Sequence, residues 1–191
     1  MHHEHNNHHE CKCSNKPAQV ESPAPLFDLE ACEGSGEHFT RVKLSALKGK
    51  WVILFFYPLD FTFICPTEIT GFNSRFDEFT KLNAVIVGAS TDSVHSHKAW
   101  INGTLGKLKY PIMADMTREV SRAYGVLLEN AGTALRGAFI IDPDGILKYS
   151  VISDDNVGRN VDEILRVLEA LQTGERCPVN WKPGEATLGK A

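Results

Sequence analysis

Cysteine 65 has the sequence context that best fits chemistry at a thiol. It follows a loop and directly precedes Pro66. Proline favours the first turn of a helix, where its missing N–H leaves no hydrogen bond unmade. A sulfur at a helix start faces free backbone N–H groups and the positive end of the helix dipole, which stabilise a thiolate. The sequence therefore predicts a nucleophilic thiolate at Cys65.

Four further residues are expected to surround this sulfur. Thr62 lies three positions earlier, so its hydroxyl can lie beside the sulfur, and Pro58 closes the loop entrance and limits access of water. Glu68, three positions later, is expected in a supporting role as the second member of a capping box. Arg136 directly precedes an apolar run and therefore lies at a sheet end. Its guanidinium is expected to hold the thiolate and a substrate oxygen together.

The remaining cysteines have weaker contexts. Five cysteines, at positions 11, 13, 32, 65 and 177, are an odd number at irregular spacing. In a chain of this length they predict thiols in a reducing compartment rather than structural disulfides. Cys32 is expected to be structural and unreactive. Cys177 lies in a polar tail, and its residue context alone leaves a free thiol and a redox partner both open.

Composition narrows the class of protein. A length of 191 residues fits one domain, and 42% hydrophobic residues are enough for a core. The net charge of -4 comes without a basic stripe, which argues against nucleic acid as a partner. No apolar run approaches the ~20 residues that span a membrane, and no secretory signal is evident. We expect a cytoplasmic protein.

The pattern of apolar residues alternates strands with helices. Strands are predicted at 51–57, 84–89, 137–141 and 147–152. Helices are predicted from 66 through 79, through 97–100, at 115–124 with Asp115 or Thr117 as cap, and at 158–173 with Gly174 as the stop. Because the early strands are separated by helices, they are expected to be parallel, and the final hairpin adds an antiparallel edge. This order predicts an α/β, thioredoxin-like fold with a mixed central sheet flanked by helices.

Three regions are expected along the chain. Residues 1–25 form a flexible arm, 26–174 the folded domain and 175–191 a C-terminal tail. The arm carries side chains that are able to ligate zinc, copper or nickel: His2, His3, His5, His8, His9, Cys11 and Cys13. A metal-binding arm and a solvated arm without metal both remain open.

Three segments resemble the peroxiredoxins. P-L-D-F-T-F-I-C-P-T-E, at 58–68, is similar to the active-site loop of that family. L-R-G-A-F-I-I-D, at 135–142, resembles the segment with its active-site arginine. G-E-R-C-P-V-N-W-K-P-G-E-A, at 174–186, resembles the resolving-cysteine segment of the typical two-cysteine subgroup. The similarity extends over about residues 26–188 and so covers a whole domain.

The resemblance implies a mechanism without a bound cofactor. Cys65 would be the peroxidatic thiolate, surrounded by Pro58, Thr62 and Arg136, and would become a sulfenic acid on reducing a hydroperoxide. Cys177 of a second subunit would then form a disulfide with it. A thioredoxin-like or flavoprotein reductant would recycle the disulfide. The resemblance further implies a homodimer, and possibly a ring of five dimers.

Two other functions are compatible with parts of the sequence. A thioredoxin-like disulfide oxidoreductase needs C-x-x-C at the strand-to-helix turn, but the fourth position is Glu68. A metal-binding accessory protein would use the arm and would leave the Cys65 loop unexplained. Residues 102–106 lack the Gly-Gly-Leu-Gly of overoxidation-sensitive relatives, and no Tyr-Phe tail follows Cys177. We therefore expect easier local unfolding, faster disulfide formation and resistance to sulfinic overoxidation.

Overall fold

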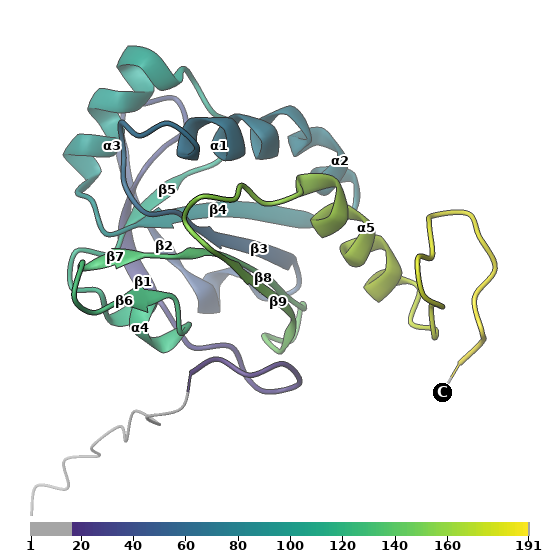
Figure 1. Cartoon of the computed structure of the whole chain (residues 1–191). Helices are drawn as coiled ribbons and strands as arrows, with labels where there is room; N and C mark the ends of the chain where they lie inside the picture. Colours follow the sequence, from purple (N-terminus) through teal and green to yellow (C-terminus); the bar gives the residue numbers. More distant parts are fainter. Residues whose placement is uncertain (1–16, 191) are drawn as a thin grey trace, which may run out of the picture.

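A seven-stranded sheet is the central element of the computed structural model, which describes residues 17–190 (Figure 1). Its strands lie in the order β2-β1-β5-β4-β3-β8-β9. Their bounds are β1 Asp28–Cys32, β2 Phe39–Lys43, β3 Trp51–Phe56, β4 Ala84–Ser90, β5 Ile112–Ala114, β8 Arg136–Ile141 and β9 Leu147–Ser153. A separate ribbon pairs β6 Leu127–Leu128 with β7 Thr133–Ala134.

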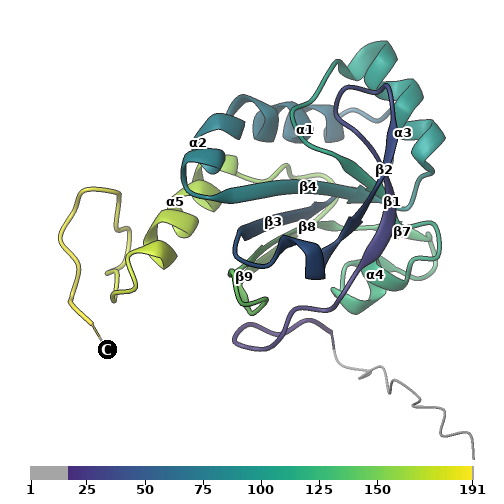
Figure 2. The same cartoon turned by 180° about the vertical axis from the view of Figure 1, so that it is seen from behind.

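Helices cover both faces of this sheet. They are α1 Cys65–Ser74, α2 Phe76–Lys81, α3 Val94–Trp100, α4 Glu119–Ala123 and α5 Val161–Gln172, with a 3₁₀ turn η1 Leu44–Leu47 and a π-helical turn η2 Ile101–Leu105. Helices α1, α2, α3 and α5 contribute to the core on one face, and α4 contributes to the core on the other (Figures 1 and 2). Within residues 17–190, no helix is long and apolar enough to cross a membrane.

The sheet is mixed, which confirms the predicted α/β layout. Strands β3, β4 and β5 are parallel, and the β8–β9 hairpin joins β3 in antiparallel pairing. The opposite edge was not predicted: β1 pairs antiparallel with both β2 and β5. Strands β1 and β2 mix charged with apolar residues, and β5 has only three residues, so none of them gives the long apolar run of a buried strand.

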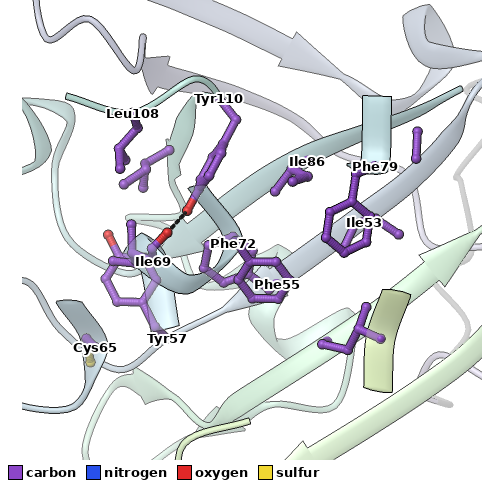
Figure 3. Close-up of a cluster of buried hydrophobic side chains, with 14 of the residues drawn as sticks. Ile53, Phe55, Tyr57, Cys65, Ile69, Phe72, Phe79, Ile86, Leu108 and Tyr110 are labelled. Carbon is purple, nitrogen blue, oxygen red and sulfur yellow. Dashed lines mark hydrogen bonds between the residues drawn. The ribbon is translucent and has the colours of Figure 1, made fainter. Parts of the chain in front are cut away.

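Strand β3 is buried on both faces, as its continuous apolar run predicts. Phe55 points toward the helices, where its ring stacks on Phe72 of α1 at 4.3 Å between centroids (Figure 3). Val52 belongs to the core on the opposite face. The Tyr110 hydroxyl donates to the Ile69 carbonyl at 2.7 Å (Figure 3). These contacts fix α1 on the sheet and so fix the position of its first turn.

The helix predicted to run from residue 66 through 79 is two helices. Arg75 interrupts it with φ -97° and ψ 3°, so α1 ends before it and α2 begins after it. The Ser74 hydroxyl donates to the Gly71 carbonyl at 2.7 Å, a local bond that competes with the helical pattern. The Arg75 guanidinium bonds to Asp162 of α5 at 2.8 Å. The prediction of one continuous helix was wrong.

Helix α4 begins later than its predicted start at residue 115. Arg118 has a left-handed φ of 63°, and the helix starts at Glu119. The Asp115 carboxylate still binds the start of the helix, because it accepts from the Ser121 backbone N–H at 2.6 Å. The N-cap position itself is occupied by Arg118, and so by neither of the two predicted caps, Asp115 and Thr117, although the Asp115 carboxylate binds an N–H group of the first turn.

The final helix matches its prediction more closely. Asn160 caps α5 by accepting from the Glu163 backbone N–H at 3.2 Å. Gly174 follows the helix with a φ of 64°, a conformation that glycine adopts without strain. The predicted helical stop at Gly174 is confirmed, and the tail that follows it extends beyond the end of α5 (Figure 1).

Residues just before the predicted domain start already contact the domain. The Ala18 N–H donates to the Ala123 carbonyl and the Ala24 N–H to the Gly145 carbonyl, each at 2.9 Å. Ala24 is also buried in the core. Packing of the chain on the sheet thus begins ahead of residue 26.

Candidate active site

Cys65 is the first residue of α1, at the end of the loop that follows β3. Pro66 occupies the start of the helix, as its sequence position predicts. Cys65 is a free thiol with 0% of its surface exposed, and it lies at one end of the core cluster (Figure 3). A sulfur in this position is shielded from bulk water and faces the N-terminal end of a ten-residue helix.

Arg136 meets this sulfur from the sheet. It is the first residue of β8, is 3% exposed, and its Nη1 donates to the Cys65 Sγ at 3.4 Å. The same Nη1 donates to a Glu68 carboxylate oxygen at 2.6 Å, and Nε donates to the Asp155 carbonyl at 2.9 Å. Burial lowers the pKa of Arg136, but its contacts with Cys65 and Glu68 outweigh burial, so that the pKa is raised. A fixed positive charge therefore touches the sulfur.

Glu68 joins this arginine to a second one. Its other carboxylate oxygen accepts from the Arg159 Nε at 2.7 Å and from the Arg159 backbone N–H at 2.8 Å. Burial raises the pKa of Glu68, yet the bonds from Arg159 and Arg136 together leave it lowered. The predicted capping box is wrong, because the carboxylate turns into the protein toward the two arginines.

Arg159 was missed in the sequence. Its side chain is 1% exposed, it donates to the Gly137 carbonyl, and its guanidinium lies over the Phe55 ring at 5.4 Å. It precedes α5 in a polar stretch and lies far from Glu68 along the chain. No local pattern marks such a residue as buried, so its role follows from tertiary packing alone.

A second buried network anchors the loop that carries the site. The Asp60 carboxylate accepts from the Tyr57 hydroxyl at 2.8 Å and contacts the His97 Nδ1 at 2.8 Å. The Asp60 backbone N–H donates to Asp92 at 2.7 Å. The loop is thereby bonded at Asp60 to α3 and to the turn before it. Sequence reasoning singled out none of these residues.

Thr62 and Pro58, both predicted near the sulfur, lie half-buried in the same loop. The Thr62 hydroxyl donates to the Leu59 carbonyl at 2.9 Å, so in this structure it closes the loop on itself. Pro58 lies two residues after the last residue of β3, where a proline cannot continue the strand. The loop thus brings both residues to the approach of α1, while the contact with Cys65 comes from Arg136.

Cys177 lies in the tail after α5 as a half-buried free thiol. Its Sγ is 3.6 Å from the Thr173 Oγ1 and 3.8 Å from the Ala170 carbonyl. Cys65 and Cys177 are thus separate thiols in this structure, each bonded to its own surroundings.

The other thiol and the arm complete the set of predicted sites. Cys32 is fully buried at the end of β1, and burial raises its pKa, as suits a structural cysteine. The arm residues His2, His3, His5, His8, His9, Cys11 and Cys13 lie outside the described residues. Within 17–190, no group of three or more His, Cys, Asp or Glu residues has the geometry to hold a metal ion.

Glu68 makes folding stability depend on acidity. Because its pKa is lowered below the ordinary value of 4.5, its ionisation stabilises the fold above that pH. This contribution falls as the pH drops through the lower folded value. We expect the free energy of unfolding in urea to decrease more steeply from about pH 5 to about pH 3 for the natural chain than for Glu68→Gln. Parallel pH profiles would contradict the assignment.

A family model, curated relatives and solved structures all place this chain among the same group of proteins. The model of the AhpC/TSA family matches residues 20–150. A putative peroxiredoxin of the rubredoxin operon of Clostridium pasteurianum is 55% identical over 174 residues, which cover 88% of this chain and 98% of that protein. A chloroplastic 2-Cys peroxiredoxin of Hordeum vulgare is 51% identical over 179 residues, covering 88% and 84%. The reduced 2-Cys peroxiredoxin of Plasmodium vivax has a similar structure, with a TM-score of 0.86, 36% identity, and coverage of 90% and 93%.

Proposed function

This chain belongs to the AhpC/TSA family and is a thiol-dependent peroxidase, and from its site we propose that Cys65 is the attacking thiolate. The observation that carries this assignment is the 3.4 Å contact between the buried Cys65 sulfur and the Arg136 guanidinium. A cation at this position favours the thiolate over the thiol. The same cation can hold a peroxide oxygen beside the sulfur.

The first step forms a sulfenic acid. The Cys65 thiolate attacks the terminal oxygen of ROOH, the O–O bond breaks, and the RO⁻ leaving group takes a proton to give ROH. Cys65 is oxidised to Cys65–SOH as the peroxide is reduced. Glu68 supports this step by holding Arg136 through the bond at 2.6 Å. Thr62 and Pro58 are proposed to complete the wall of the site at the loop, where the peroxide enters.

In the second step Cys177 of another subunit is proposed to condense with the sulfenic acid. The Cys177 sulfur forms the S–S bond, the S–O bond of Cys65 breaks, and water leaves with the thiol proton. The buried position of Cys65 supports a requirement for local opening of the first turn of α1. The position of the tail at the side of the molecule, beyond α5, supports transfer between subunits (Figure 1).

The family implies an oligomer, and the finer assembly is part of the proposal. We propose a homodimer, able to form a ring of five dimers, in the cytoplasm. The odd number of cysteines at irregular spacing supports a reducing compartment. A thioredoxin-like or flavoprotein reductant is proposed to attack the disulfide and return both thiols. Because Glu68 stands where a C-x-x-C motif beginning at Cys65 would have its second cysteine, disulfide exchange of the C-x-x-C type is not favoured.

Peptide mass spectrometry tests these roles directly. Reduced protein is treated with one equivalent of hydrogen peroxide, then alkylated and digested. The natural chain is expected to give a Cys65–Cys177 link between chains, and Cys177→Ser is expected to give Cys65 sulfenic acid without the link. Mixing isotope-labelled and unlabelled chains distinguishes a link between chains from one within a chain. Oxidation confined to Cys11 and Cys13, with Cys65 unmodified, would overturn the proposal.

A further inference from the structure

The tail that carries Cys177 forms a closed loop (Figures 1 and 2). The Arg176 backbone N–H donates to the Gly189 carbonyl at 3.0 Å, and the Leu188 N–H donates to the Arg176 carbonyl at 2.8 Å. The Thr187 hydroxyl donates to the Glu175 carboxylate. Because these bonds join the start of the loop to its end, residues 175–189 are able to move as a unit on α5.

One arginine of α5 holds this loop. The Arg166 Nη1 donates to the Trp181 carbonyl at 2.9 Å, while its Nε and Nη2 donate to the Glu163 carboxylate at 2.6 and 2.7 Å. The hydrogen bonds to Glu163 raise the pKa of Arg166, so the cation is permanent. Trp181 is only 4% exposed, and its indole N–H donates to the Glu185 carbonyl at 3.0 Å. The loop is thus attached to α5 at a buried point by a cation with a fixed orientation.

This attachment keeps Cys177 turned toward its own helix. The Cys177 sulfur lies against the C-terminal end of α5, 3.8 Å from the Ala170 carbonyl and 3.6 Å from the Thr173 hydroxyl. To reach Cys65 of another subunit, the sulfur has to leave these oxygens. Since Cys177 and Trp181 belong to the same closed loop, the bond from Arg166 opposes that movement.

We propose that Arg166 is a positioning residue that restrains the Cys177 loop on α5 and thereby sets the rate of disulfide formation. The inference rests on the proposed role of Cys177. Two reactions compete for Cys65–SOH: condensation with the Cys177 thiol, which releases water, and oxidation by a second hydrogen peroxide, which gives Cys65–SO₂H and water. A tighter restraint slows the first reaction and leaves more time for the second. Arg166 therefore also sets sensitivity to overoxidation.

The test compares three variants of the full-length chain after rapid mixing with hydrogen peroxide and acid quenching. Arg166→Met is expected to form the Cys65–Cys177 disulfide about three- to tenfold faster than the natural chain, the range for one partly exposed charged hydrogen bond. It is also expected to need more peroxide for Cys65 sulfinic acid to appear. Arg166→Lys keeps a donor and a charge, so its rate of disulfide formation is expected to lie between those of the natural chain and Arg166→Met. Arg75→Met, the matched control, removes another arginine bonded to α5 and is expected to leave both quantities unchanged.

Two further measurements distinguish release of the Cys177 loop from general damage to the fold or to the site. The rate of Cys65–SOH formation should be the same in all four proteins, because Arg166 does not contact the peroxidatic sulfur. Hydrogen exchange should become faster at residues 175–189 in Arg166→Met and stay unchanged elsewhere. An equal or slower disulfide rate in Arg166→Met overturns the restraint while leaving the peroxidase assignment intact. Absence of the disulfide from the natural chain overturns the role proposed for Cys177 itself.

Discussion

Cys65→Ser is expected to abolish peroxide reduction, lowering kcat/KM by at least about a thousandfold. Serine keeps the size of the side chain and its place at the start of α1, but its hydroxyl stays protonated beside Arg136 and cannot supply a sulfenic acid. The loss is therefore chemical rather than structural. Consumption of hydrogen peroxide with dithiothreitol as reductant measures it, and thermal unfolding checks that the variant remains folded.

Cys32→Ala provides the matched control for this substitution. Cys32 is as buried as Cys65, lies in the same core cluster, and bonds only weakly to the Glu33 carbonyl, at 3.5 Å. The control variant is expected to keep peroxidase activity and to lose some stability. Substantial peroxide reduction by Cys65→Ser, or its loss in Cys32→Ala without unfolding, would contradict the assignment of the reaction to Cys65.

Glu68→Ala is expected to lower the free energy of unfolding by about 3–5 kcal/mol, the cost of breaking a buried ion pair by removing one partner. The variant leaves the guanidinium groups of Arg136 and Arg159 inside the protein without their shared carboxylate. Peroxidase activity is expected to fall as well, because Arg136 loses the bond that orients it toward Cys65. Urea denaturation followed by circular dichroism measures the stability.

Glu163→Ala is the appropriate comparison, since it also removes a carboxylate that binds an arginine through two hydrogen bonds. The Glu163 side chain is 42% exposed, against 2% for Glu68, so water can replace the lost partner. Glu163→Ala is therefore expected to lower the free energy of unfolding by about 1 kcal/mol or less. Equal costs for the two variants would show that burial does not govern the Glu68 interaction.

The sequence predicted those parts of the fold that depend on local patterns. The apolar run of β3, the turn of the β8–β9 hairpin and Pro66 at the start of α1 each carry a signal within a few residues. The break at Arg75 was not predictable in the same way, because its guanidinium bonds to Asp162 of a distant helix. The short strand β5 depends on its pairing with β1 and β4, which lie far earlier in the chain.

The same distinction holds for the site: residues with a local signal were predicted, and residues that act through distant contacts were not. Cys65 and Arg136 were found because each stands at the end of a recognisable element and matches a family segment. The partners that orient them were not found: Arg159 reaches Glu68, and His97 reaches Asp60, only after the sheet has assembled. Glu68 was found but assigned a local cap, since nothing in its neighbourhood indicates that two arginines converge on it. Long-range electrostatics is the part that the sequence did not reveal.

The carboxylate of Glu68 bonds three segments together: α1, the start of β8 and the approach to α5. Two of these segments, α1 and β8, also carry Cys65 and Arg136 of the proposed site, so damage to that site and damage to the fold coincide. In a growing cell, a variant at this position would be cleared by proteases along with the fraction of molecules that it unfolds. The cell would contain less of the protein. Raising its expression would not restore peroxide resistance in proportion, because the molecules that do fold would also have a damaged site.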